Sequence, residues 1–304
     1  MYPLSFLNNL INGIGLGSVY AIIALGYTMV YGIAKMLNFA HGDVIMVGAY
    51  VCFFASSTYG LHPLVGVLLA MAVCTVLGVV IERLAYKPLR QAPSLAVLIT
   101  AIGMSYFLQN AAQLLWTPNP KVFPAFFTLA NPDGTSRTGV DLFGGQLTVR
   151  FTTIVNLLVC IVIMVLLTWF TGNTKMGKAM RACSENKDAA RLMGIDVNFT
   201  ISITFAIGSA LAAIAGVLFL SSYQTLVPTT GSMPGIKAFT AAVFGGIGSI
   251  PGAFLGGVLL GVIEIMAGAY ISTQLSNAIV FAVLIITLLV RPAGLLGKQV
   301  REKV

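Results

Sequence analysis

Long stretches without a charged side chain dominate the sequence. They occupy residues 1–34, 44–81, 91–120, 151–174, 197–236, 238–263 and 265–290. A helix that spans a membrane needs about 20 consecutive apolar residues, so the stretch at 44–81 is long enough for two crossings and the others for one each. The pattern predicts an all-α, polytopic integral membrane protein with eight or nine transmembrane helices, at 6–31, 43–58, 63–86, 94–116, 152–171, 200–223, 237–249, 252–270 and 277–291.

Two of these segments, 43–58 and 237–249, are short enough to be re-entrant or broken helices. Beside them, Asn38–Asp43 and Gly245–Gly252 interrupt the apolar pattern. Non-helical backbone at membrane depth occurs where protein or a water-filled cavity satisfies its polar groups, and discontinuous helices of this kind line transport sites. The alternative is a tight turn between two ordinary helices.

Small residues recur at four-residue spacing, which lets helix backbones approach closely in a membrane. The pairs and triplets are Gly13/Gly17, Gly208/Ala212/Gly216, Gly252/Gly256 and Gly257/Gly261. They serve either packing within the chain or an interface with a partner.

The composition excludes a soluble protein. Hydrophobic residues make up 58% of the 304 residues and charged residues only 9%, against roughly 25% charged in a soluble domain. We expect one transmembrane domain over residues 1–304. The first stretch is too long for the core of a cleaved signal and lacks a basic start, so we expect a retained helix. Nothing in their spacing pairs the cysteines, which are read as small buried residues: Cys52, Cys74, Cys160 and Cys183.

The net charge of +8 lies in short segments between apolar stretches. Because no surface of interleaved aromatic and basic residues is visible, the charge indicates topology and not a nucleic-acid partner. Lys and Arg in short loops mark the cytoplasmic side. This predicts that 82–93, 172–199 and the tail 291–304 are cytoplasmic, and that the loop 117–151 is external. With nine crossings, the N-terminus is external as well.

The sequence shows no motif that predicts nucleotide binding, metal binding or catalysis. Gly172–Lys178 matches the phosphate-loop pattern G-x-x-x-x-G-K, but a membrane helix precedes it and Ala179 stands where Mg²⁺ binding needs Ser or Thr. The histidines, His41 and His62, have no helix-face partner for a metal. With no catalytic triad visible either, we expect neither ATP binding, nor a metal, nor enzymatic activity in this chain.

Two carboxylates lie in or beside apolar stretches, Asp43 and Glu264. A buried ionisable group is costly unless it is paired or hydrated, which makes both candidate functional residues. The alternative for Glu264 is an inert internal salt bridge with Lys237. The alternative for Asp43 is a helix cap, since Asp is favourable near a helix N-terminus.

The stretch Met176–Ile195, called the 176–195 segment below, combines alternating charges with apolar Met180, Ala190 and Met193. It predicts two short amphipathic helices that are broken around 184–186 and end at Gly194. Such a surface is too polar for the lipid interior and indicates a docking element for a soluble partner. The alternative is an interfacial helix on anionic lipid.

An ordered series of short stretches runs along nearly the whole chain: Gly17–Ala21, Tyr27–Gly32, Asn38–Gly42, Ile81–Arg83, Ala101–Ser105, Phe107–Asn110, Arg181–Cys183, Lys237–Val243 and Gly245–Ala253. In this series the sequence closely resembles the permease subunits of ABC importers for branched-chain amino acids, of the H type found in high-affinity systems for leucine, isoleucine and valine. The loop 117–151 is less similar to the family.

The resemblance implies the ABC importer permease fold and a multi-pass location in a bacterial inner membrane. It also implies a second homologous permease, two cytoplasmic ATP-binding subunits that hold ATP and Mg²⁺, and a periplasmic binding protein for branched-chain amino acids. This chain itself would carry no cofactor. The 176–195 segment would be the coupling element seated in one ATP-binding subunit, through Met176, Gly177, Arg181, Glu185, Asn186, Ala189, Ala190 and Gly194.

A leucine-like substrate needs polar groups for its ammonium and carboxylate, which helix N-termini and side-chain amides can supply. The candidates along the pathway are Asn38, His41, Ser105, Gln109, Asn110, Thr240 and Glu264. Rival functions are a permease of the same family for urea, short amides or another amino acid, and a stand-alone channel or secondary transporter. The docking element favours the importer, because a self-sufficient channel does not need one.

Overall fold

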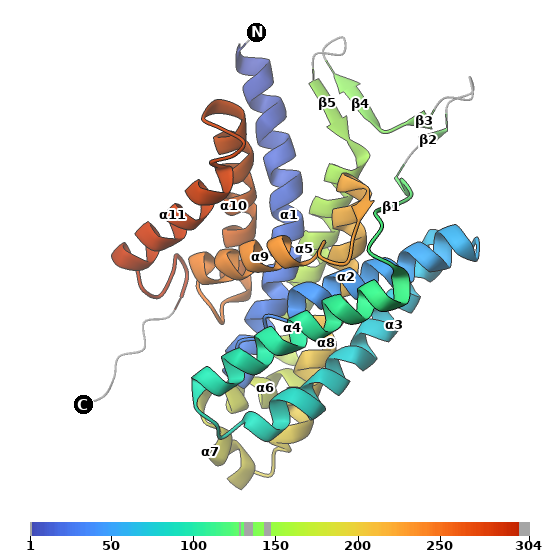
Figure 1. Ribbon diagram of the computed structural model, residues 1–304. Helices are drawn as coiled ribbons and strands as arrows, with labels where there is room; N and C mark the ends of the chain where they lie inside the picture. The colour runs from blue at the N-terminus through green and yellow to red at the C-terminus, as the bar shows by residue number, and fades with distance from the viewer. Residues whose placement is uncertain (1, 128, 131–135, 143–146, 298–304) are drawn as a thin grey trace. The chain divides into compact units, whose positions relative to one another are not determined.

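The computed structural model describes residues 2–127, 129–130, 136–142 and 147–297, and helices dominate it (Figure 1). The main helices are α1 (Tyr2–Ala34), α2 (His41–Phe53), α3 (Pro63–Ile81), α4 (Ser94–Trp116), α5 (Phe151–Asn173), α8 (Val197–Tyr223), α9 (Ser232–Gly245), α10 (Ile250–Tyr270) and α11 (Ser276–Val290). Shorter helices are α6 (Lys175–Glu185) and α7 (Lys187–Leu192). The π-helices η1 (Phe54–Thr58) and η2 (Glu82–Tyr86) extend α2 and α3, and the 3₁₀-helix η3 (Lys87–Leu89) follows.

Each of the nine predicted segments coincides with one main helix to within a few residues. Among the described residues, six helices are long and apolar enough to cross a membrane: α1, α3, α4, α5, α8 and α10. Three are shorter, namely α2, α9 and the apolar α11. The polytopic all-α architecture is confirmed, and so is the expectation that 43–58 and 237–249 hold short helices. The number of crossings stays a prediction.

Apolar side chains on three of the long helices point out of the molecule. Leu68 and Val76 of α3, Leu114 of α4 and Leu166 of α5 are all more than half exposed. A soluble protein rarely exposes apolar surface on this scale, whereas lipid covers it without cost. These helices therefore present a lipid-compatible surface.

The sequence did not predict the small strands. Two hairpins form in the loop 117–151, β2 (Leu129–Ala130) with β3 (Ser136–Arg137) and β4 (Gly139–Leu142) with β5 (Leu147–Arg150). In addition, β1 (Lys121–Val122) pairs antiparallel with β6 (Thr225–Leu226). This pairing brings the C-terminal ends of α4 and α8 together. The predicted topology likewise ends both helices on one side.

Some residues behind the topology prediction lie outside the described part of the chain. They are Asp133 of the loop and Lys298, Arg301 and Lys303 of the tail.

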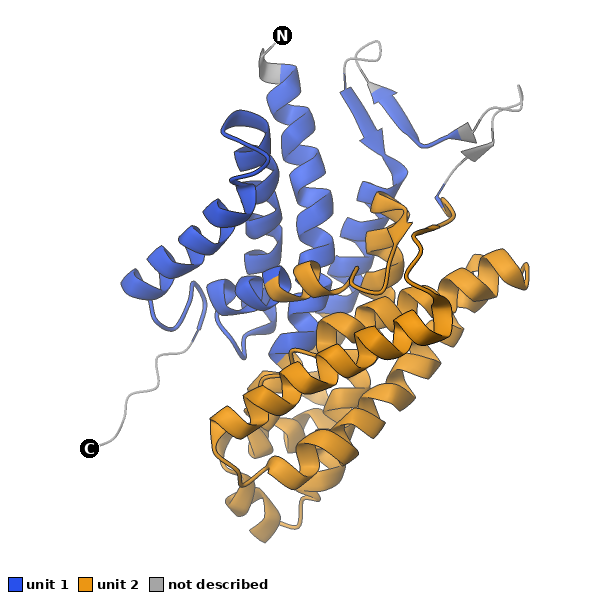
Figure 2. Ribbon diagram, in the orientation of Figure 1, with its two compact units in different colours: residues 1–28, 127–164, 237–304 blue, residues 29–126, 165–236 orange. Residues whose placement is uncertain are grey.

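The chain divides into two compact units, each built from separated parts of the sequence (Figure 2). Unit 1 holds residues 1–28, 127–164 and 237–304, and unit 2 holds residues 29–126 and 165–236. The chain passes between the units inside α1, α5 and α9, as well as in the loop after α4. A single permease domain over 1–304 stays a prediction.

In unit 2, α2 is the central helix. All its residues except Val51 and Phe53 are buried, and it packs against α3, α4 and α8. A Cβ added at Gly48 would lie 2.7 Å from the Cα of Ala213 on α8, so the two backbones are in close contact. The predicted small-residue row Gly208/Ala212/Gly216 is buried on α8.

In unit 1, α1 and α10 cross at the predicted glycines. A Cβ added at Gly13 would lie 2.8 Å from the Cα of Val262, and one at Gly17 would lie 2.7 Å from the Cα of Val258. These glycines therefore serve packing within the chain. Further along, the predicted interruption before α10 is a short turn, where Gly246 and Gly248 adopt φ values of +109° and +93°.

Candidate functional site

The 176–195 segment has the predicted form of two short helices, and its side chains define where each begins and ends. The Thr174 hydroxyl accepts a hydrogen bond from the amide of Gly177 and caps α6. Asn186 ends α6 and caps α7, with its side-chain oxygen accepting from the amides of Asp188 and Ala189. Gly194 closes the segment at φ +80°, where a left-handed residue suits a helix C-terminus. The predicted break around 184–186 is confirmed.

Burial divides the predicted coupling residues into two groups. Met176 is half-buried, while Arg181, Glu185, Asn186, Ala189 and Gly194 are exposed. Gly177 and Ala190 lie inside the chain instead: a Cβ at Gly177 would lie 2.5 Å from the Cα of Thr171, and Ala190 is 3% exposed. These two residues are thus not available for direct contact with a partner, because they pack the segment against its own chain.

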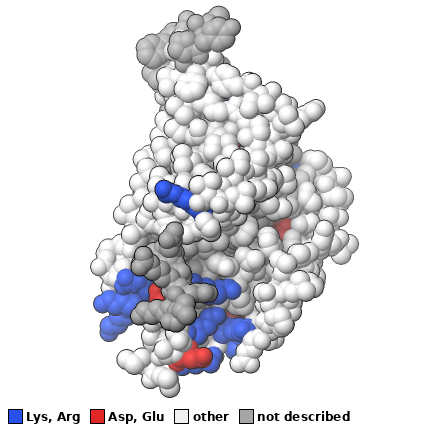
Figure 3. Space-filling view, turned by 90° about the vertical axis from the view of Figure 1, so that its left-hand side faces the viewer, with Lys and Arg blue, Asp and Glu red and all other residues white. Residues whose placement is uncertain are grey.

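The most exposed apolar side chains of the segment were not among the predicted coupling residues. Leu192 is 89% exposed and Met193 is 82% exposed, and Arg191 and Asp188 lie beside them in sequence as an ion pair. Adjacent exposed apolar side chains rimmed by charges make this end of the segment a candidate docking surface. Charged side chains gather in the lower part of the view in Figure 3, whereas much of the rest of this face is uncharged.

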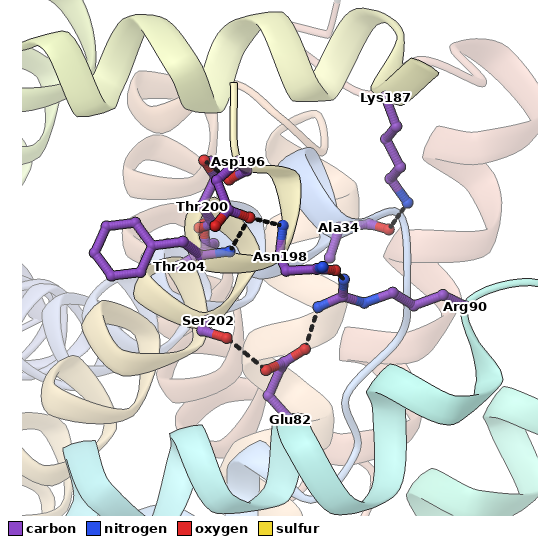
Figure 4. A network of polar contacts seen from close by, with 10 residues as sticks. Ala34, Glu82, Arg90, Lys187, Asp196, Asn198, Thr200, Ser202 and Thr204 are labelled. Atoms are coloured by element: carbon purple, nitrogen blue, oxygen red, sulfur yellow. Dashed lines mark hydrogen bonds and ion pairs between the residues drawn. The ribbon is translucent and has the colours of Figure 1, made fainter. Parts of the chain in front are cut away.

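A buried ionic network lies next to the segment (Figure 4). The Glu82 carboxylate, fully buried in η2, accepts hydrogen bonds from Arg90 and from the hydroxyl of Ser202 on α8, the latter at 2.7 Å. Arg90 also donates to the side-chain oxygen of Asn198 at the start of α8. Separating Glu82 from its partners would leave a buried charge unpaired, which is costly. The network therefore holds the end of α3 to the start of α8, the helix that follows the 176–195 segment.

Lys187 reaches from α7 to the end of α1. Its ammonium donates to the carbonyl of Ala34, the last residue of α1, at 2.7 Å (Figure 4). Burial lowers the pKa of Lys187, and the positive charge of Arg90 lowers it further. Burial likewise raises the pKa of the neighbouring Cys183 thiol.

A second polar cluster joins α2, α4 and the start of α9. The Gln109 side-chain nitrogen donates to Asp43 at 2.9 Å, to Ser232 at 3.1 Å and to Ser105 at 3.2 Å. Asp43 is buried, and the N-cap position of α2 is Ala40 with no side-chain cap. Asp43 lies in the first turn of α2, where a carboxylate is favourable, and it also accepts from Gln109 of α4.

The other predicted pathway residues of unit 2 are placed differently. Asn38 is buried and accepts a hydrogen bond from the Tyr86 hydroxyl at 2.9 Å, and His41 is buried at the start of α2. Asn110 is exposed, and its amide donates to the carbonyl of Tyr106 on its own helix at 2.7 Å. The structure thus does not bring Asn110 into the cluster around Asp43.

Unit 1 contains the remaining two predicted pathway residues. Glu264 of α10 pairs with Lys237 of α9 at 2.6 Å, and the Lys237 ammonium also lies 5.9 Å from the centre of the Tyr20 ring. The second carboxylate oxygen of Glu264 is buried without a hydrogen-bond partner among the described residues. Thr240 is buried one turn after Lys237. The predicted ion pair is therefore present, with one acceptor position unused.

An apolar groove of about 580 Å³ lies at the junction of α2, η1, α3 and α4. Its lining is mainly aliphatic and aromatic and includes Phe54, Leu115 and Trp116. No lining residue is charged, so the groove offers no partner for the ammonium or carboxylate of an amino acid.

Sequence reasoning missed several of these contacts. The sequence marks Arg90 only as a topology signal and Glu82 only as part of the family-like stretch Ile81–Arg83, and it does not single out Ser202 or Ser232. One signal was available: Glu82 closes the apolar stretch 44–81 just as Asp43 precedes it. Within the described residues, no group of three His, Cys, Asp or Glu side chains could hold a metal ion.

Comparison with known proteins gives a consistent result. Residues 9–288 match the family described as "Branched-chain amino acid transport system / permease component". The high-affinity branched-chain amino acid transport system permease protein LivH of Salmonella typhimurium is 44% identical, with 99% of this chain and 98% of the relative covered. BraD, the corresponding permease protein of Pseudomonas aeruginosa, is also 44% identical, with 98% of each chain covered.

More distant matches include one further permease and one solved structure. The ribose import permease protein RbsC of Escherichia coli K12 is 27% identical, with 84% of this chain and 76% of the relative covered. The solved structure of PsaBC from Streptococcus pneumoniae in complex with Fab aligns at a TM-score of 0.48 and 14% identity, covering 94% of this chain and 92% of that chain. Given the full-length similarity to LivH and BraD and the match over 9–288, this chain belongs to the family of branched-chain amino acid transport system permease components.

Proposed function

We propose that the chain is the permease subunit of an ATP-driven importer for leucine, isoleucine and valine. LivH and BraD are permease proteins of high-affinity branched-chain amino acid transport systems, and both match this chain over almost its whole length. The chain forms half of the translocation pathway beside a second homologous permease. A periplasmic binding protein delivers the substrate, and two cytoplasmic ATP-binding subunits hold ATP and Mg²⁺.

The exposed apolar pair Leu192 and Met193 carries this proposal. Leu192 ends the short charged helix α7 and Met193 follows it, and neighbouring exposed apolar side chains rimmed by charges are typical of a protein interaction site. An ATP-binding subunit is the partner that fits, since it supplies the energy that this chain lacks. Arg181, Glu185, Asn186 and Ala189 surround the contact, while Gly177 and Ala190 support it from below.

Two polar sites are candidates for contact with the substrate during passage. The cluster of Asp43, Ser105, Gln109 and Ser232 offers a carboxylate and hydroxyls for an α-ammonium group. The Lys237–Glu264 pair offers one charge for each end of a zwitterion. Both are weak, transient sites in an importer whose binding protein captures the substrate.

The proposed membrane topology follows from the distribution of Lys and Arg among the loops. The chain is a single permease domain of residues 1–304 in the bacterial inner membrane, with the N-terminus and the loop 117–151 in the periplasm. The 172–199 region and the tail 291–304 face the cytoplasm. The pairing of β1 with β6 supports this arrangement, because α4 and α8 then end on the same side.

Purification and reconstitution test the proposal. The tagged chain, extracted gently from its native membrane, is expected to bring with it two ATP-binding subunits and a second permease. In proteoliposomes with its binding protein, this complex is expected to accumulate leucine only when ATP is hydrolysed. Recovery of the chain alone, or leucine flux without ATP, would contradict the proposal.

A permease for urea, short amides or another amino acid is the second candidate. The 27% identity to a ribose import permease shows that similar sequences occur in permeases named for different substrates. Uptake of labelled urea, acetamide and other amino acids by the same proteoliposomes distinguishes the two. Uptake of one of these in preference to leucine, isoleucine and valine would favour the second candidate.

A further inference from the structure

Lys187 is the residue of the 176–195 segment that reaches furthest along the chain. Hydrogen bonds that the side chains of Arg181 and Ser184 donate, and those that the Asn186 side chain accepts, stay within residues 172–189. The bond from Lys187 to the Ala34 carbonyl, at 2.7 Å, links residues 153 positions apart. It therefore ties the docking segment to the end of α1.

The surroundings of Lys187 do not favour a positive charge. The side chain is half-buried, and Arg90, Lys35 and Arg191 are the cations that act on it. Its hydrogen bond is made to the C-terminal end of α1, where the free carbonyls and the helix dipole attract a cation. The ammonium is thus held by a directional contact at a helix C-terminus, against the repulsion of the nearby cations.

The Ala34 carbonyl, which accepts the hydrogen bond from Lys187, stands directly before the connection between α1 and α2. Lys35 leaves α1 in the left-handed region at φ +56°, and Asn38 is fixed by the Tyr86 hydroxyl at 2.9 Å. Three residues after Asn38, α2 begins, and its first turn carries Asp43, which accepts from Gln109. The contact with α7 is thus made at Ala34, directly before the connection 35–40, and this connection leads to the buried polar cluster.

We propose that Lys187 is a positioning residue that transmits displacement of the 176–195 segment to the start of α2, through the Ala34 carbonyl and the connection 35–40. When the ATP-binding subunits move the segment, the hydrogen bond draws the end of α1 with it. The start of α2 follows, and the contact between Asp43 and Gln109 changes. This inference rests on the proposed docking of the segment to an ATP-binding subunit.

The test replaces Lys187 in the reconstituted importer. Lys187→Met keeps an unbranched chain of similar length but cannot donate to the carbonyl, and Lys187→Arg keeps the donor. Lys175→Met is the matched control, because Lys175 is exposed in the first turn of α6 and no side-chain partner is described for it. The measurements are recovery of ATP-binding subunits, basal ATP hydrolysis, and leucine imported per ATP hydrolysed.

Lys187→Met is expected to assemble and to hydrolyse ATP at the basal rate, while leucine imported per ATP falls about tenfold, the effect of losing one charged hydrogen bond from the coupled state. Lys187→Arg is expected to retain most of the ratio, and Lys175→Met all of it. An unchanged ratio in Lys187→Met would overturn the inference. Loss of assembly would overturn it as well, because Lys187 would then be structural. Failure of the wild-type complex to couple uptake to ATP would instead overturn the proposed function.

Discussion

At the scale of single residues, the Lys237–Glu264 pair is a buried ion pair and a proposed contact for the substrate. The two side chains are 9% and 14% exposed and lie 2.6 Å apart. A buried pair contributes little net stability, but removing one partner leaves an uncompensated charge. The partnerless oxygen of Glu264 leaves room for a further donor such as an ammonium group. Stability and transport can therefore be separated experimentally.

Glu264→Gln and Lys237→Met are each expected to lower the free energy of unfolding by about 3 kcal/mol, because each leaves one buried charge unpaired. The double variant Lys237→Met/Glu264→Leu removes both charges and is expected to regain most of that stability. Because it can no longer bind the ends of a zwitterion, it is expected not to regain leucine uptake. Thermal unfolding in detergent and uptake in proteoliposomes are the measurements. Full uptake by the double variant would show the pair to be a simple salt bridge.

At the scale of helices, glycine contacts set the distance between α1 and α10 in unit 1. A Cβ at Gly17 would lie 2.7 Å from the Cα of Val258, and backbone atoms cannot rotate away as a flexible side chain does. In a membrane, where no hydrophobic effect drives helices together, such close packing supplies much of the association. The contact is therefore sensitive to a single methyl group.

Gly17→Ala is expected to destabilise the folded protein by about 1–3 kcal/mol, the cost of overpacking a tight contact. Gly103→Ala is the control, since a Cβ at Gly103 of α4 meets nothing within 4 Å. Alanine is about 1 kcal/mol more favourable than glycine within a helix, so this variant is expected to be as stable as the wild type or slightly more so. Midpoints of thermal unfolding compare the two. Equal midpoints for Gly17→Ala and the wild type would show that α1 and α10 can move apart.

The proposed docking surface at the end of α7 can be tested by placing a charge on it. Leu192→Glu places a charge on the most exposed apolar position of the segment and is expected to weaken binding of the ATP-binding subunit about tenfold, as truncation of an interface anchor does. Lys175→Gln changes the net charge by the same amount at the start of α6 and is expected to bind normally. Co-purification at several salt concentrations measures both. Normal binding by Leu192→Glu would place the interface elsewhere.

Helix positions could be predicted from the sequence because each helix carries its own signal of length and hydropathy. The expected segment 94–116 is the observed α4, and the break around 184–186 is the cap at Asn186. Contacts between distant residues carry no such signal: Ser202 binds Glu82 from 120 positions away. The burial of Ala190 could not be predicted either, because an alanine among charged residues can lie on an exposed docking surface or on a face packed against the chain.

At the scale of the whole molecule, the direction in which the chain crosses the membrane decides where the partners bind. Charge in the loops predicts that 172–199 lies in the cytoplasm and 117–151 outside. Both regions have well-exposed positions, Met193 at 82% and Val122 at 80%. The native cysteines are buried and unpaired, and a buried thiol reacts slowly. A single cysteine introduced at either position can therefore show on which side of the membrane it lies, because the native cysteines add little labelling.

In cells with an opened outer membrane, a membrane-impermeant maleimide is expected to label Val122→Cys and to leave Met193→Cys unlabelled until the inner membrane is permeabilised. The chain is expressed without its partners, so that no ATP-binding subunit shields residue 193. The unsubstituted chain is the control for background. Labelling of Met193→Cys in intact cells would place the 176–195 segment outside, where no ATP-binding subunit can reach it. The docking of α7 and the role of Lys187 would then fall together, because both require the segment to face the cytoplasm.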